Sequence, residues 1–151
     1  MMPAGASKEV EGFFQCSRLL RQTMRYHGTF LVVDDDPDTS GVVRELLVRS
    51  GKSVRTVQSL ISAKEAIEEI GHENVACIIL DVLFPVDSGV AFAYWLHKTY
   101  SDIPFFVYTC AKKSWVRDAL NYVGVSAQVV EKNGSMAELV DALGLQLGAA
   151  V

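Results

Sequence analysis

Short apolar runs and longer amphipathic stretches follow one another along most of the chain. The runs predict five strands, at 30–33, 53–57, 75–80, 104–108 and 127–130. The stretches between and after them carry apolar residues at helical spacing and predict five helices, at 39–50, 62–70, 88–100, 114–123 and 135–145. Continuous apolar strands indicate burial on both faces. Their strict alternation with helices predicts a doubly wound parallel α/β sheet.

The first 28 residues stand outside this alternation. Ser7 suits a helix N-cap, arginines gather toward the far end of the segment, and Gly28 is placed to end a helix. We therefore predict an N-terminal helical extension at 1–28, which either docks on its own domain or a twin, or links to an upstream domain. The globular domain is expected at 29–147, followed by a tail at 148–151.

Composition narrows the function classes. The 151 residues carry 14 Lys and Arg against 18 Asp and Glu, and half of the residues are hydrophobic. This length suits one domain with a real core, and the acidic balance argues against a nucleic-acid partner held by charge. Three widely separated cysteines form no disulfide framework, which fits a reducing, cytoplasmic setting. No apolar run approaches ~18 residues, so we expect no membrane span.

Charged and hydroxyl residues follow four of the five predicted strands. Asp34–Asp36 follow the first strand, Asp81 the third, Thr109 the fourth, and Glu131 and Lys132 the fifth. Each alone fits an ordinary turn, cap or surface role. In a parallel sheet, however, the carboxyl ends of the strands share one edge, and ligands bind there. These side chains are therefore expected to gather at one site.

Such a gathering has a specific chemistry. Neighbouring carboxylates repel each other and raise one another's pKa, a penalty that a hard divalent cation such as Mg²⁺ removes. A lysine ammonium and a threonine hydroxyl suit the oxygens of a phosphoryl group. An aspartate in this setting can itself be the nucleophile and form an acyl phosphate. The pattern therefore indicates a phosphoryl-transfer site.

Four segments together resemble a known family. They are FLVVDDDP (30–37), IILDVLFPVDSG (78–89), VYTCAKK (107–113) and VVEKNGS (129–135). In this order and spacing they are similar to the response regulator receiver domain (CheY-like) of two-component signal transduction. The resemblance covers roughly residues 29–145. It implies a flavodoxin-like sheet of strand order 2-1-3-4-5 with five helices.

The resemblance also implies a role for each site residue. Asp81 matches the aspartate that accepts a phosphoryl group from a kinase phosphohistidine. The implied Mg²⁺ ligands are Asp34, Asp35, Asp81 and the backbone carbonyl of Leu83. Thr109 would hydrogen-bond the phosphoryl oxygens.

Lys132 would pair with the same phosphoryl oxygens. The implied partners are a sensor histidine kinase or phosphotransfer protein and a downstream effector protein, with a homodimer as a further option. No enzymatic turnover is expected beyond self-catalysed phosphorylation and dephosphorylation of the aspartate.

Three departures from the family pattern matter. Asn133 follows Lys132, where the family usually has proline. No aromatic residue lies at 128–129, where the family carries its switch side chain on the fifth strand. Leu83 and Ala111 occupy the positions that tune hydrolysis, and neither side chain can orient a water. We therefore expect a comparatively long-lived phosphorylated state.

Two other interpretations compete with an active phosphoacceptor. The first two departures fit a phosphorylation-independent (degenerate) receiver that only binds proteins. A phosphatase of the haloacid dehalogenase kind also uses a strand-end aspartate, within D-x-D-x-[TV]. Here Asp34–Asp38 puts an acid in the last place, and Asp81 would have no role. The phosphatase is the weakest of the three.

Overall fold

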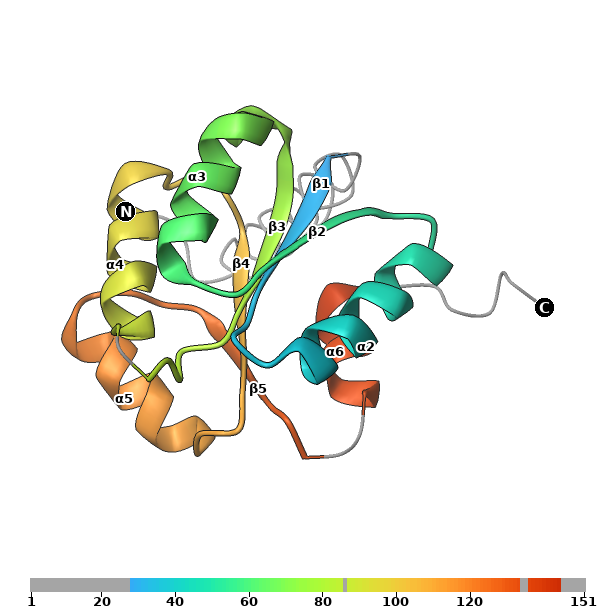
Figure 1. Ribbon diagram of the computed structural model, residues 1–151. Coiled ribbons are helices and arrows are strands. Elements are labelled where there is room, and N and C mark those ends of the chain that lie inside the picture. Colours follow the sequence, from blue (N-terminus) through green and yellow to red (C-terminus); the bar gives the residue numbers. More distant parts are fainter. Residues whose placement is uncertain (1–27, 86, 134–135, 145–151) are drawn as a thin grey trace, which may run out of the picture.

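A five-stranded parallel sheet forms the centre of the computed structural model, which describes residues 28–85, 87–133 and 136–144 (Figure 1). The strand order is β2-β1-β3-β4-β5. This confirms the predicted order. The strand bounds are β1 (Thr29–Val33), β2 (Ser53–Val57), β3 (Val75–Leu80), β4 (Phe105–Thr109) and β5 (Gln128–Glu131).

In the described part of the chain, five α-helices cover the two faces of the sheet, as expected for a flavodoxin-like fold. They are α2 (Pro37–Arg49), α3 (Leu60–Ile70), α4 (Gly89–Thr99), α5 (Lys113–Tyr122) and α6 (Ala137–Leu143), and a short 3-10 turn, η1 (His72–Asn74), precedes β3. Helices α3, α4 and α5 pack on one face, and α2 and α6 on the other (Figure 1). Within the described segments, no helix is both long enough and apolar enough to cross a membrane.

The position of β3 at the centre of the sheet explains why its sequence is entirely apolar. All six of its residues are buried. Ile78 and Leu80 join the core beneath α3, α4 and α5, whereas Cys77 and Ile79 join the core beneath α2 and α6. A strand that is covered on both faces has no position for a polar side chain.

Strands β2 and β3 have the predicted bounds, and the other elements differ from prediction by one or two residues at one or both ends. Helix α3 begins at Leu60 rather than Ser62, because the Ser59 hydroxyl caps it by accepting from the Ser62 N–H at 3.1 Å. Strands β4 and β5 each begin and end one residue later than predicted. Thr109 and Glu131 are therefore the last residues of their strands and lie opposite each other in the register.

Most of the predicted extension at 1–28 and the whole tail at 148–151 lie outside the described residues. Only Gly28 belongs to the described part of the extension. The proposed domain limits, including 29–147, therefore stay predictions.

Candidate functional site

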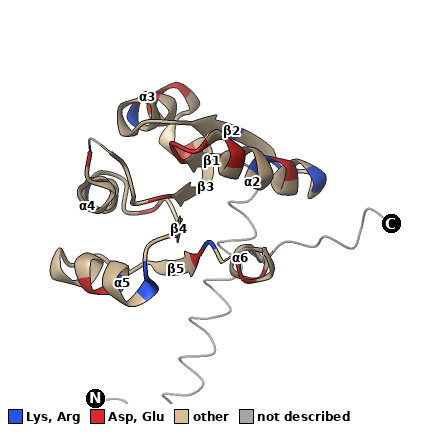
Figure 2. Ribbon diagram, turned by 60° about the horizontal axis from the view of Figure 1, so that its bottom comes forward, with Lys and Arg blue, Asp and Glu red and all other residues tan. Residues whose placement is uncertain are grey.

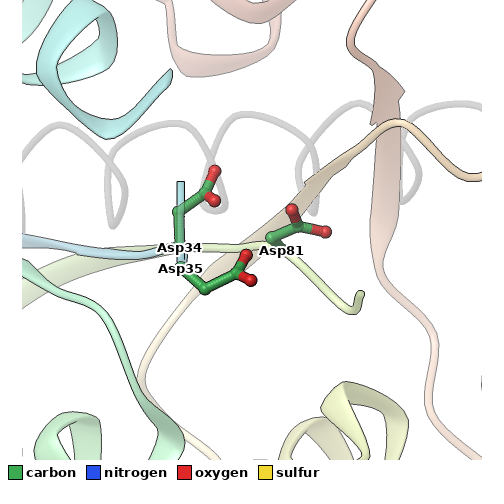
Figure 3. Close-up of side chains that lie close together, drawn as sticks. All are labelled: Asp34, Asp35 and Asp81. Atoms are coloured by element: carbon green, nitrogen blue, oxygen red, sulfur yellow. The ribbon is translucent and has the colours of Figure 1, made fainter. Parts of the chain in front are cut away.

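Three aspartates meet at the carboxyl ends of two neighbouring strands (Figure 3). Asp34 and Asp35 follow β1, and Asp81 follows β3. Sheet hydrogen bonding continues to these positions, because the Asp81 N–H donates to the Val33 carbonyl at 2.9 Å. One carboxylate oxygen from each aspartate lies within 4.8 Å of the others. The structure thus brings together the acidic residues that the sequence singled out.

Lys132 reaches this cluster from the end of β5. Its Nζ lies 2.6 Å from Oδ2 of Asp34 and 2.9 Å from Oδ2 of Asp81. Both aspartates are buried, at 3% and 6% exposure, whereas Asp35 is exposed. Figure 2, with the carboxyl edge of the sheet turned forward, shows acidic segments after β1 and β3 and a basic one directly after β5. One ammonium therefore contacts two of the three clustered carboxylates.

Burial and the contacts with Lys132 shift the pKa values of the buried groups. Burial raises the pKa of Asp34 above its ordinary value, although the hydrogen bond from Lys132 opposes the rise. Burial alone would lower the pKa of Lys132. Its hydrogen bonds to Asp34 and Asp81 outweigh that effect, so the pKa of Lys132 is raised and its ammonium stays charged at neutral pH.

Each buried carboxylate is also fixed by its own turn. The Asp36 N–H donates to Oδ1 of Asp34, and the Leu83 N–H donates to Oδ1 of Asp81, both at 2.9 Å. One oxygen of each carboxylate thus binds backbone, and the other binds Lys132. Such side-chain turns are typical of aspartate and hold the carboxylates in one orientation.

The loop after Asp81 turns back tightly into α4. Leu83 and Ser88 form an isolated antiparallel bridge, and α4 begins at the next residue, Gly89. A Cβ at Gly89 would lie 2.6 Å from the carbonyl oxygen of Val82. Only glycine lets the two backbones approach this closely, so Gly89 sets the path of the loop beside Asp81.

Thr109 is fully buried at the end of β4. Its Oγ1 accepts from the Ala111 N–H at 3.2 Å, and its carbonyl accepts from the Lys132 N–H at 2.8 Å. These hydrogen bonds join Thr109 to the end of β5 through the backbone and hold its hydroxyl within its own loop.

Asp36 belongs to the helix and not to the acidic cluster. It caps α2, accepting from the Asp38 N–H at 3.0 Å and the Thr39 hydroxyl at 2.8 Å. These hydrogen bonds, led by the one from Thr39, lower its pKa. The sequence signal was present, since Asp36 precedes a proline in the first helical position.

Tyr108 is a neighbour of the site that the sequence did not single out. Lys132 Nζ lies 5.6 Å from the centre of its ring, and its hydroxyl donates to Sδ of Met136 at 3.3 Å. β5 carries no aromatic residue, so an aromatic side chain reaches the lysine from β4 instead. Only the pairing of β4 with β5 reveals this contact.

The donor set fits a hard divalent cation. The clustered ligand atoms are carboxylate oxygens, and one ammonium leaves the cluster with an excess of negative charge. Mg²⁺ prefers oxygen ligands and retains several waters, which the exposed side of Asp35 permits. The residues present therefore suit the predicted ion.

Comparison of the chain with known protein families identifies its family. The response regulator receiver domain family matches residues 30–144, most of the chain. The chain belongs to this family. No curated protein sequence matches the chain.

Several solved structures share the receiver domain fold. The chemotaxis protein CheY4 of Vibrio cholerae is 22% identical, with a TM-score of 0.68 and coverage of 78% of this chain and 96% of that one. The beryllofluoride-activated NtrC4 receiver domain dimer is 23% identical, with a TM-score of 0.65 and coverage of 77% and 93%. A response regulator of Burkholderia pseudomallei, with a phosphorylated aspartic acid and a calcium ion, is 24% identical, with a TM-score of 0.62 and coverage of 77% and 66%.

Proposed function

We propose that this receiver domain accepts a phosphoryl group on Asp81, from the phosphohistidine of a sensor histidine kinase or a phosphotransfer protein, in a Mg²⁺-dependent step. The observation that carries the proposal is the double contact of Lys132 with Asp34 and Asp81, beside a third carboxylate. An acidic cluster with one fixed cation suits phosphoryl transfer, where catalysis is mostly positioning and charge neutralisation.

The step proceeds by attack of one Asp81 carboxylate oxygen on phosphorus. A new P–O bond forms, and the P–N bond to the donor imidazole breaks. The electron pair of that bond stays on the imidazole nitrogen, which takes a proton from solvent. The product is an acyl phosphate on Asp81.

The surrounding residues have separate roles in this step. Lys132 already lies 2.9 Å from Asp81, so its ammonium can pair with the incoming phosphoryl oxygens. The Thr109 hydroxyl, which can also donate a hydrogen bond, would bind another of these oxygens. When bound by Asp34, Asp35, Asp81 and the Leu83 carbonyl, Mg²⁺ supplies positive charge that offsets the repulsion between carboxylates and phosphoryl oxygens.

Phosphorylation would then change partner binding. The phosphoryl group adds about −1.5 to −2 charges beside Lys132 and biases the loops at this edge of the sheet. The output is carried by a downstream effector protein or by a second copy of the chain. The NtrC4 relative, a dimer when activated by beryllofluoride, supports the second option.

The test is incubation of the protein with acetyl phosphate, with and without Mg²⁺, followed by intact mass measurement. We expect the mass of one phosphoryl group to appear only with Mg²⁺. Asp81→Asn should abolish the gain, because the amide is not a nucleophile. Asp87→Asn, which changes an exposed aspartate in the same loop, is the matched control and should be labelled like the wild type.

The degenerate receiver is the second candidate, because β5 carries no aromatic residue and Asn133 follows Lys132. The same experiment separates the two. If the wild type gains no mass while another receiver domain is labelled under the same conditions, the chain is a protein-binding module. Steady release of inorganic phosphate from a phosphomonoester would instead support a phosphatase and contradict our proposal that the chain is not an enzyme.

A further inference from the structure

Both ends of the loop from Thr109 to Lys113 lie beside the same residue of β5, Glu131. Thr109 lies opposite Glu131 in the β4–β5 register. At the other end of the loop, the Lys113 N–H donates to Oε1 of Glu131, with an N···O distance of 2.6 Å. The Glu131 residue thus closes the loop that carries the Thr109 hydroxyl.

The Glu131 carboxylate also replaces a local cap on α5. Lys112 occupies the N-cap position and makes no side-chain hydrogen bond there. The first amides of a helix have no partner within the helix, and a carboxylate near them gains from both the hydrogen bond and the helix dipole. The start of α5 is therefore set by a side chain 18 residues away in sequence.

Glu131 is joined directly to the functional lysine. The next residue, Lys132, holds Asp34 and Asp81 through its ammonium and donates its backbone N–H to the Thr109 carbonyl. The end of β5 therefore carries the cation of the site and also the anchor of the Thr109 loop.

We propose that Glu131 is a positioning residue for phosphoryl transfer to Asp81. Its carboxylate holds the 109–113 loop against the strand end that carries Lys132, and so sets where the Thr109 hydroxyl lies relative to the Lys132 ammonium. The inference rests on the proposed function. A displacement of about 1 Å in such a group can cost as much as ~10²-fold in rate.

The side chain of Lys113 makes a second contact, with α6. The Lys113 ammonium lies 2.8 Å from Oε1 of Glu138 on that helix. A shift of the loop would therefore be felt by α5 and α6 together. This ion pair must be separated from the Glu131 contact in any test, because both involve Lys113.

Four variants make that separation. Glu131→Ala removes the acceptor, whereas Glu131→Gln keeps an acceptor oxygen at the same place. Lys113→Pro removes the donor N–H and is tolerated, because proline suits the first helical position and Lys112 is already extended, with φ −64° and ψ 128°. Lys113→Ala keeps the N–H and removes only the ammonium that pairs with Glu138.

The measurement is the rate of phosphorylation by acetyl phosphate with Mg²⁺, followed by intact mass at several acetyl phosphate concentrations. We expect Glu131→Ala and Lys113→Pro each to lower the maximal rate by at least about five-fold, the lower end of typical coupling between groups, with little change in half-saturation. Glu131→Gln and Lys113→Ala should stay close to the wild type. Combining Glu131→Ala with Lys113→Pro in one protein should cost no more than either single change, because both remove the same hydrogen bond.

Each outcome decides the inference. If the wild type is labelled and both Glu131→Ala and Lys113→Pro react at its rate, the positioning role is wrong and the proposed function stands. If the wild type is never labelled, the proposed function fails and the inference fails with it. Far-UV circular dichroism checks folding, and if Glu131→Ala does not fold, the comparison of Lys113→Pro with Lys113→Ala decides alone.

Discussion

One lysine ammonium balances two buried carboxylates in this receiver domain. Lys132 contacts Asp34 and Asp81, and its side chain is only 10% exposed. Removing one partner from a buried ionic group leaves uncompensated charge, which is more costly than the net value of the contact itself. The groups that are proposed to act in phosphoryl transfer therefore also contribute to the stability of the free protein.

Lys132→Met should destabilise the protein by about 3 kcal/mol, the low end for breaking a buried ionic contact. The physical reason is that Asp34 and Asp81 then face each other without a cation. Urea unfolding at neutral pH measures the loss. Lys112→Met, at an exposed lysine, is the control and should change little; equal losses in the two variants would contradict the prediction.

We expect Leu83 to influence the lifetime of the proposed acyl phosphate. Its side chain is 42% exposed beside Asp81 but has no group that can orient a water. Leu83→Asn should shorten the lifetime, by less than the ~10²–10⁴-fold of an optimised general base. Loss of phosphoryl mass with time measures it, and Leu83→Met should decay like the wild type. A wild-type lifetime of seconds would count against the prediction.

Tyr108 gives a stability change at alkaline pH. Burial, the largest effect, raises the pKa of its hydroxyl above the ordinary value of 10. The unfolded chain therefore loses this proton at a lower pH than the folded one, so stability falls as pH rises above about 10. Tyr108→Phe should lose less stability between pH 9 and pH 11, as measured by denaturant unfolding; an identical slope in the two proteins would refute the assignment to Tyr108.

At the scale of the elements, two glycines in helices have opposite roles. A Cβ at Gly41 of α2 meets nothing within 4 Å, whereas one at Gly89 of α4 would meet the backbone of Val82. Gly41→Ala should stabilise the protein by about 0.5–1 kcal/mol, the helix propensity difference. Gly89→Ala should destabilise it by about 1–3 kcal/mol through overpacking. Thermal unfolding compares them, and a stable Gly89→Ala would show that the β3–α4 loop can move aside.

Element types and order followed from the sequence because their causes are local. The apolar run of β3 alone indicates burial on both faces. Element ends were less accurate, since Ser59 and Asp36 cap helices earlier than the apolar spacing begins. The contact of Glu131 with Lys113 could not be predicted, because it depends on where a flexible side chain points after β5 has paired with β4.

At the scale of the whole molecule, the acidic cluster should couple ion binding to stability. A ligand that binds only the folded state stabilises it, by about 1.4 kcal/mol at ten times its Kd. We expect Mg²⁺ to raise the unfolding midpoint of the wild type but to raise that of Asp35→Asn much less. Asp38→Asn, an exposed aspartate in α2, should respond like the wild type. Equal responses in all three proteins would argue against the assigned ligands.

The candidate residues could be predicted as one site because the carboxyl ends of parallel strands lie at the same edge of the sheet. Asp34, Asp81 and Lys132 follow three parallel strands, so predicting a parallel sheet, whose carboxyl ends share one edge, was enough to place them at one site. The hydrogen bonds that orient them were not accessible from order alone. They depend on turns such as Asp81–Leu83, whose geometry the sequence only suggests.

The cation of this site is joined to its two anions across 98 and 51 residues of chain. Ribosomes add about 5–20 residues per second, so the acidic residues exist for several seconds before Lys132 is synthesised. During that time the nascent chain can form β1, β2 and β3 but lacks Lys132, the residue that balances Asp34 and Asp81 in the folded protein. The site is thus completed only when β5 has been made, and a chain released before β5 would carry the acidic cluster without its cation.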